Sequence, residues 1–214
     1  MTRPPTPGDQ HLRFLAEADL YAERFGWATL PMRHHPGGKK PPAAANVEEF
    51  LRRPPDANER QRLFRAQPNI TGLLAILGAP SHGVYSRDFE DPPAYWSWAD
   101  ANPEAARRLP TIATWRAYAI LAYADRPIRA KQFPDGELVG EGHLRALPHS
   151  LHPSGKWVYR WIVPPQPRRP ENTLDPHDIG LDRPWGDSSL PSGTERQRDG
   201  ETEGQSTSPP TSVP

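Results

Sequence analysis

The sequence predicts an α+β fold with a central, largely antiparallel sheet flanked by helices, followed by a disordered C-terminal tail. Helix-type and strand-type segments are mixed without the regular alternation that a parallel sheet requires. A continuous apolar run at 70–77 suits a strand that is buried on both faces. The 29 prolines and the hydrophobic fraction of 35% are unusual for one uniform globule, and they indicate a segment that does not fold.

The first expected helix begins near Asp9 and ends at Gly26. Apolar residues recur at helical spacing over 14–25, and glycine is typical of the residue that ends a helix. The remaining expected elements are a strand at 27–32, helices at 46–51 and 57–66, strands at 70–77 and 84–90, an aromatic-rich helix at 93–101, and short strands at 111–114, 118–124, 128–132, 137–139 and 157–163.

We place the folded domain at residues 9–163 and the disordered tail at 164–214. The tail is rich in Pro, Ser, Thr and Gly, and from residue 165 onward it has nine acids against five arginines and no lysine. Such a composition cannot bury enough apolar surface to offset the entropy lost on ordering. Trp185 and Leu190 are the only apolar anchors that we expect near its beginning. The net charge of zero therefore hides a mildly positive domain, which is compatible with a phosphate-backbone partner.

The composition excludes several classes of protein. The chain has no cysteine, which excludes disulfides and thiolate metal sites and fits a reducing compartment. Residues 1–10 are polar and lack the apolar core of a signal peptide. The longest apolar runs are far too short to cross a bilayer. We therefore expect a soluble cytoplasmic protein with no membrane partner.

The sharpest candidate site is the pair Asp88 and Glu90 at the end of an expected strand. Residues two apart on a strand project from the same face, so both carboxylates point one way. Mg²⁺ and Mn²⁺ are commonly held by one or two carboxylates together with substrate phosphates. The alternative interpretation is a solvated acidic strand end before a turn.

A second group of polar residues follows at 135–156. Glu137 is a candidate third carboxylate on a neighbouring strand, and Ser150, His152 and Ser154 are candidates for contacts to phosphate or base. The alternative is a hairpin with a proline-rich turn, in which His152 bonds only a backbone carbonyl.

A third group combines cations with aromatic rings, an arrangement found in channels that bind single-stranded nucleic acid through stacked bases. The alternative is ordinary solvated surface. Its members are Arg116, Lys39, Lys40, Arg129, Lys131 and Arg145, interspersed with Trp115, Trp157 and Tyr159.

Together these features resemble the N-terminal catalytic domain of the bifunctional DNA primase/polymerases, within the archaeo-eukaryotic primase superfamily. The resemblance covers roughly residues 10–162, and the matching stretches occur in the family order. They are YAERFGW at 21–27, GKKP at 38–41, LGAPSHG at 77–83, RDFEDP at 87–92, LPTIAT at 109–114, DGELVGEG at 135–142, and SLHPSG at 150–155 ending in YRW at 159–161.

The resemblance implies a primase-type fold and template-dependent nucleotidyl transfer with Mg²⁺ or Mn²⁺. DNA template and nucleoside triphosphates would be the substrates. Asp88 and Glu90 match the paired metal-binding catalytic acids of the family, and Glu137 matches the third acidic position. The chain has no helicase-type phosphate loop, so the resemblance implies a helicase or replication initiator that acts in trans.

Two further features concern nucleotide binding. Ser150, His152 and Ser154 fall on a recurring motif of the family. After the threonine strand, the family shows a glycine-containing stretch ending in a histidine that contacts the phosphates of the incoming nucleotide. Here Trp115 and Ala117 replace the expected glycines, and Ala119 replaces the histidine.

This departure leaves three hypotheses open. The first is a metal-dependent primase/polymerase with impaired nucleotide binding, in which Arg116 supplies the missing charge. The second is a degenerate primase-like module that binds single-stranded DNA or a replication partner without synthesis. The third is an unrelated α+β binding domain.

Overall fold

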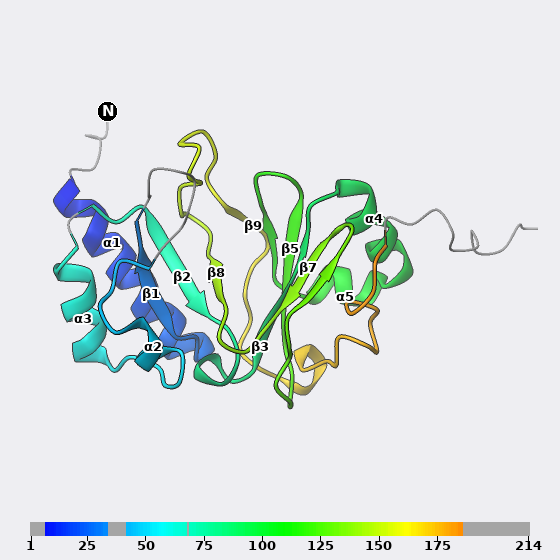
Figure 1. The fold of residues 1–214 in the computed structure, drawn as a ribbon, viewed down its shortest axis with the longest axis horizontal. Helices are drawn as coiled ribbons and strands as arrows, with labels where there is room; N and C mark the ends of the chain where they lie inside the picture. Colours follow the sequence, from blue (N-terminus) through cyan, green and yellow to red (C-terminus); the bar gives the residue numbers. More distant parts are fainter. Residues whose placement is uncertain (1–6, 34–41, 68, 186–214) are drawn as a thin grey trace, which may run out of the picture.

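The computed structural model describes residues 7–33, 42–67 and 69–185 (Figure 1). The elements in chain order are α1 (Pro7–Leu20), η1 (Tyr21–Phe25), β1 (Thr29–Met32), α2 (Val47–Phe50), α3 (Ala57–Arg65), β2 (Gly72–Ile76), η2 (Ala79–Ser81), β3 (Val84–Phe89), α4 (Pro92–Ala101), α5 (Pro103–Arg108), β4 (Thr111–Ala113), β5 (Tyr118–Tyr123), β6 (Lys131–Phe133), β7 (Gly136–Val139), β8 (Leu144–Ala146), β9 (Arg160–Val163) and η3 (Pro170–Asn172).

The strands of the described residues form two antiparallel sheets. The small sheet has the order β1-β2-β8, and the large sheet has the order β6-β7-β3-β5-β4-β9. The two sheets occupy the middle of the molecule, with α1 to α3 at one end and α4 and α5 at the other (Figure 1). The predicted α+β class, with antiparallel pairing and flanking helices, is confirmed. The strands form two sheets in place of the single expected one, and β8, which the sequence did not predict, pairs with β2 in the small sheet.

The first helix ends where the sequence predicts. α1 continues into one wider turn, η1, and Gly26 follows with a φ of 69°, in the left-handed region that glycine adopts without strain. The Gly26 N–H donates to the carbonyl of Ala22 at 3.2 Å, which satisfies one of the last free carbonyls of the helix.

The two faces of the large sheet have different neighbours. Successive side chains on a strand alternate between faces. In β3, Tyr85 and Phe89 pack in one apolar cluster with residues of α4 and α5. Ser86 and Asp88 point the other way and are hydrogen-bonded by Arg145 from β8 of the small sheet. The space between the two sheets therefore lies on the face that Asp88 occupies.

The segment 164–185 corrects the expected boundary of the domain. We predicted it as part of the tail, but Leu181 and Trp185 are buried. Buried donors reach its backbone: Trp98 Nε1 donates to the Ile179 carbonyl at 2.8 Å, and Tyr85 Oη donates to the Leu174 carbonyl at 3.1 Å. A few large apolar side chains, together with these bonds, are enough to order a polar segment. The rest of the predicted tail, 186–214, lies outside the described residues.

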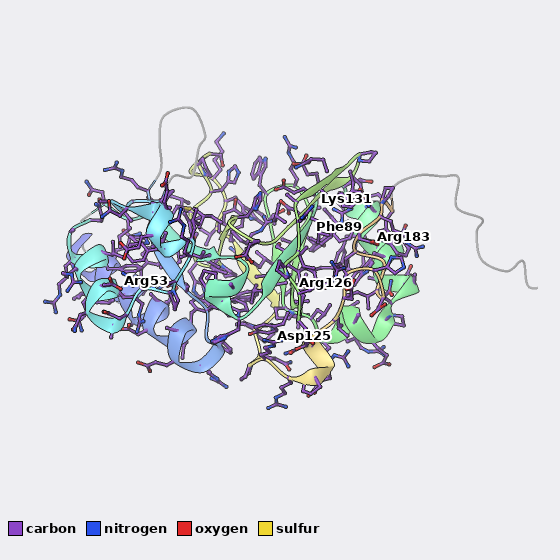
Figure 2. All side chains as sticks on the ribbon, turned by 60° about the horizontal axis from the view of Figure 1, so that its bottom comes forward. Arg53, Phe89, Asp125, Arg126, Lys131 and Arg183 are labelled. Atoms are coloured by element: carbon purple, nitrogen blue, oxygen red, sulfur yellow. The ribbon has the colours of Figure 1, made fainter. Side chains whose placement is uncertain are left out.

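A further contact joins the large sheet to this segment, and another lies within the segment itself. Lys131 Nζ donates to the Asp182 carbonyl at 2.7 Å, and the Arg183 guanidinium lies over the Trp185 ring, 4.6 Å from its centroid. Lys131 and Arg183 lie at the same end of the molecule as Phe89 (Figure 2). Among the described helices, none is both long and apolar enough to cross a membrane.

Candidate functional site

A cleft of about 370 Å³ lies at the end of β3. It brings together four of the predicted site residues, Asp88, Glu90, Arg116 and His152, which come from three separate stretches of the chain. The complete lining is Asp88, Phe89, Glu90, Thr114, Trp115, Arg116, Arg145, His152 and Tyr159.

Asp88 forms an ion pair that links the two sheets. Arg145 Nη1 donates to Asp88 Oδ2 at 3.0 Å, and Arg145 Nε donates to Ser86 Oγ at 3.1 Å. The two charged side chains are 10% and 20% exposed, for Arg145 and Asp88 respectively. Burial alone would lower the pKa of Arg145, but the carboxylates of Asp88 and Glu137 raise it above its usual value. Arg145 is therefore a permanent cation in the floor of the cleft.

Glu90 forms a second pair at the rim of the cleft. It follows the last residue of β3, and its N–H donates to the Asp135 carbonyl at 2.9 Å. Its carboxylate is paired with Arg116, and both side chains are more than half exposed. Exposed pairs of this kind contribute about 0–1 kcal/mol, so a ligand can separate them at little cost.

Glu137 lies next to Asp88 but does not line the cleft. The two residues are direct partners in the register of β3 and β7, so their side chains share one face of the sheet. Gln132 Nε2 donates to Glu137 Oε2 at 2.7 Å. Within residues 7–33, 42–67 and 69–185, no three acids or histidines are grouped to hold a metal ion. Asp88 and Glu90 both line the cleft, and each carboxylate is paired with an arginine, Arg145 and Arg116 respectively.

His152 is oriented by the turn that follows it. The Ser154 N–H donates to His152 Nδ1 at 3.1 Å, and Ser154 Oγ lies 3.0 Å from the same nitrogen. The Lys156 N–H in turn donates to Ser154 Oγ at 3.3 Å. Ser154 therefore positions His152, and it does not itself line the cleft.

The other nucleotide-binding candidates lie elsewhere. Ser150 is fully buried, and its Oγ accepts from the Leu73 N–H at 2.8 Å and donates to the Leu73 carbonyl at 3.2 Å. Both bonds hold the chain against β2, so Ser150 has a structural contact in place of the expected ligand contact. Lys39 and Lys40 lie outside the described residues.

Three further cleft residues, Arg145, Trp115 and Tyr159, belong to the predicted group of cations and aromatic rings. The signal for Arg145 is its place in the apolar run 144–147, where a lone cation indicates a buried partner. Tyr159 carries a phenol whose pKa is raised to about 12, chiefly by burial, with Arg145 opposing the shift and Asp88 reinforcing it. It therefore stays protonated, able to donate a hydrogen bond, at neutral pH.

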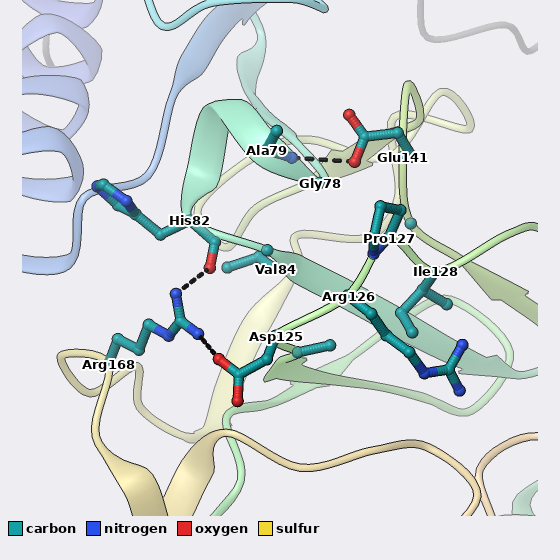
Figure 3. A pocket seen from close by; sticks show the side chains of 13 residues that line it. Gly78, Ala79, His82, Val84, Asp125, Arg126, Pro127, Ile128, Glu141 and Arg168 are labelled. Atoms are coloured by element: carbon teal, nitrogen blue, oxygen red, sulfur yellow. Dashed lines mark hydrogen bonds and ion pairs between the residues drawn. The ribbon is translucent and has the colours of Figure 1, made fainter.

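A second hollow, of about 280 Å³, lies near the start of β3 (Figure 3). Its charged side chains hold loops together. Glu141 Oε2 accepts from the Ala79 N–H at 3.1 Å, while Arg168 donates to the His82 carbonyl at 3.1 Å and pairs with Asp125. No predicted site residue in the described part of the chain lines this hollow. The cleft at Asp88 is therefore the candidate functional site.

A comparison of the chain with protein-family models finds no match, and a comparison with curated proteins likewise finds none.

Proposed function

We propose that the cleft performs template-dependent, divalent-metal-dependent nucleotidyl transfer on DNA, as in the primase/polymerases that the sequence resembles. The supporting observation is that Asp88, Glu90, Arg116 and His152, which are distant in sequence, line a single cleft. The two acids share the cleft with two permanent cations, Arg116 and Arg145, and this combination matches the needs of a reaction between phosphate-bearing substrates.

In this proposal, Asp88 and Glu90 bind Mg²⁺ or Mn²⁺ together with the phosphates of a nucleoside triphosphate. The ion, when bound, supplies activation of the attacking hydroxyl and neutralises charge on the leaving group. Arg145 stays beside Asp88 and offsets the negative charge of the substrate. His152 lines the same cleft and contributes an imidazole that can hydrogen-bond the substrate.

A second candidate function is binding of single-stranded DNA without synthesis. Two observations favour it. Asp88 already uses one carboxylate oxygen to bind Arg145. Ala119, where the resemblance expects a phosphate-binding histidine, is fully buried. In both functions a helicase or replication initiator acting in trans would deliver the DNA.

The first test is primer extension and primer synthesis by the full chain with Mg²⁺ or Mn²⁺. Asp88→Asn and Glu90→Gln remove one charge each while keeping the shape of the side chain. We expect each to reduce synthesis by about a hundredfold, since loss of a metal ligand costs at least as much as loss of its supporting contacts. Glu104→Gln is the matched control, because Glu104 is an exposed, arginine-paired acid on α5.

The outcomes separate the two functions. Synthesis that depends on Asp88 and Glu90 supports the enzyme. Binding of single-stranded DNA without synthesis supports the binding module, and this binding should weaken steeply with added salt because contacts to phosphate release counterions. A wild-type chain that neither synthesises nor binds DNA contradicts both.

A further inference from the structure

The loop that joins β4 to β5 is a tight turn. The Thr114 N–H donates to the Ala117 carbonyl at 3.1 Å, and the Ala117 N–H donates to Thr114 Oγ1 at 3.2 Å. These two bonds fix the backbone of the residues between them, Trp115 and Arg116. Both of their side chains line the cleft. A cation and an indole are thus presented side by side from a short, closed loop.

The indole of Trp115 is supported by two other rings. It stacks on the imidazole of His152, with ring centroids 5.6 Å apart and an angle of 18° between the planes. Trp157 contacts it edge-on at 6.3 Å. Even so, 49% of Trp115 is exposed. A half-exposed indole that neighbouring rings support at a cleft is a suitable surface for another flat ring.

The cation beside it is available to an anion. Arg116 is 63% exposed and its partner Glu90 is 55% exposed, so their attraction is weakened by water. A phosphate, like a carboxylate, accepts two parallel N–H bonds from one guanidinium, so it can replace the solvated Glu90 carboxylate as the partner of Arg116. The volume of about 370 Å³ is at the lower end of the range for small-molecule sites and is suited to one nucleotide unit.

We propose that Trp115 is a base-stacking platform and that Arg116 binds the phosphate of the same nucleotide unit. The inference rests on the proposed function for the class of ligand, a nucleobase joined to phosphate. Two sources supply this chemistry: a free nucleoside triphosphate, or one nucleotide of a single-stranded DNA. In either case Arg116 leaves Glu90 when the ligand enters, which frees the Glu90 carboxylate.

The chain contains a matched control for Trp115. Trp96 on α4 is 53% exposed, so its removal changes the exposed apolar surface to a similar extent. Its ring neighbours, Tyr95 and Tyr118, meet it edge-on at 72° and 71°. Trp96 does not line the cleft. For Arg116 the control is Arg107, which is similarly exposed and pairs with an exposed acid on α5.

The experiment measures binding of a labelled oligothymidylate to the full chain by fluorescence polarisation. Trp115→Ala should weaken binding by about five- to a hundredfold, the range for loss of one base–aromatic stack. Trp115→Phe should retain most of the affinity, and Trp96→Ala should retain all of it. Arg116→Ala, unlike Arg107→Ala, should lower the slope of log affinity against log salt by about one.

Two further probes identify what the platform holds. An abasic oligomer should bind wild type and Trp115→Ala equally, because it has phosphates but no bases to stack. Unlabelled thymidine triphosphate should compete with the oligomer if the cleft takes a free nucleotide. Failure to compete, with the effect of Trp115 intact, assigns the platform to the DNA strand.

The inference is overturned if wild type binds the oligomer and Trp115→Ala binds it equally well. It is also overturned if Trp96→Ala weakens binding to the same extent as Trp115→Ala. Because Trp115 is half exposed, thermal melting of the variant should match wild type, which excludes misfolding as the cause of lost binding. A wild-type chain that binds neither probe contradicts the proposed function as well.

Discussion

The two faces of the large sheet place similar ion pairs in different surroundings. Arg87 and Asp88 are neighbours in β3 and point to opposite faces. Arg87 pairs with Asp135 at 2.7 Å, and the two side chains are 0% and 3% exposed. Asp88 pairs with Arg145 at 3.0 Å on the face of the cleft, where both partners retain some exposure. A buried pair serves the fold, whereas a pair on a cleft is accessible to ligands.

The surroundings of Arg87 explain why it is unavailable for chemistry. Its guanidinium lies over the rings of Phe89 and Phe133, 4.2 and 4.6 Å from their centroids. Burial lowers its pKa, and the Asp135 carboxylate acts against that shift. Asp135 Oδ2 also accepts from the Trp185 N–H at 3.0 Å. The pair therefore joins the sheet to the segment that covers it.

The largest effect should come from uncovering this face. Truncation after Pro164 removes Leu181 and Trp185, which are buried, and the carbonyl partners of Tyr85 and Trp98. Each large apolar side chain contributes about 1.5–3 kcal/mol and each hydrogen bond about 1 kcal/mol. We expect a loss on the order of 5 kcal/mol in the free energy of unfolding, measured with urea.

Truncation after Trp185 is the control for this experiment. It removes only residues 186–214, and their composition predicts no change in stability. Equal stability of both truncated chains and wild type would show that the covering segment adds nothing, and it would restore the domain boundary that the sequence predicted.

The next effect concerns the buried pair itself. Arg87→Ala leaves Asp135 as an uncompensated buried charge, which typically costs 3–5 kcal/mol. Asp88→Asn on the opposite face keeps a hydrogen-bond acceptor for Arg145 and should cost about 1 kcal/mol. Urea unfolding of the two variants measures the difference. If both variants lost a similar free energy of unfolding, the buried pair and the partly exposed pair would not differ in their contribution to stability.

The sequence was most informative about strands with strong local patterns. The apolar run at 70–77 contains β2, which is buried throughout as predicted. The composition of the small sheet was not accessible in this way. Its strand β2 pairs with β8, which follows about 70 residues later and has only three residues. The order of segment 164–185 was also missed, since its few apolar residues act through distant partners such as Trp98.

The candidate site shows the same limit. Spacing alone placed Asp88 and Glu90 on one side of the chain, and the structure puts both on the cleft. Residue spacing gave no means of distinguishing Ser150 from His152. Ser150 bonds the backbone of Leu73, whereas His152, two residues later, lines the cleft. Arg145 becomes prominent only when β8 is placed opposite β3, because its partner lies 57 positions away.

The smallest effect should come from Ala119, which is the register partner of Asp88 in β5. Its side chain faces the same way as Asp88, but it is fully buried in the core shared with the small sheet. Ala119→His must fit an imidazole into that core, which costs about 1–3 kcal/mol. Burial would favour the neutral ring, whereas the carboxylate of the register partner Asp88 would favour the charged ring. We therefore expect lower stability and no gain in nucleotide affinity.

Ala119→Leu is the matched variant, since it adds comparable volume without polar atoms. A similar loss of stability in both variants assigns the cost to overpacking, and a larger loss for histidine assigns the excess to an unpaired ring nitrogen. The opposite result is equally informative. A stable Ala119→His that binds thymidine triphosphate more tightly would show that position 119 reaches the cleft. Arg145 and the histidine introduced on β5 would then bind a phosphate together. This result would directly support the primase-type arrangement.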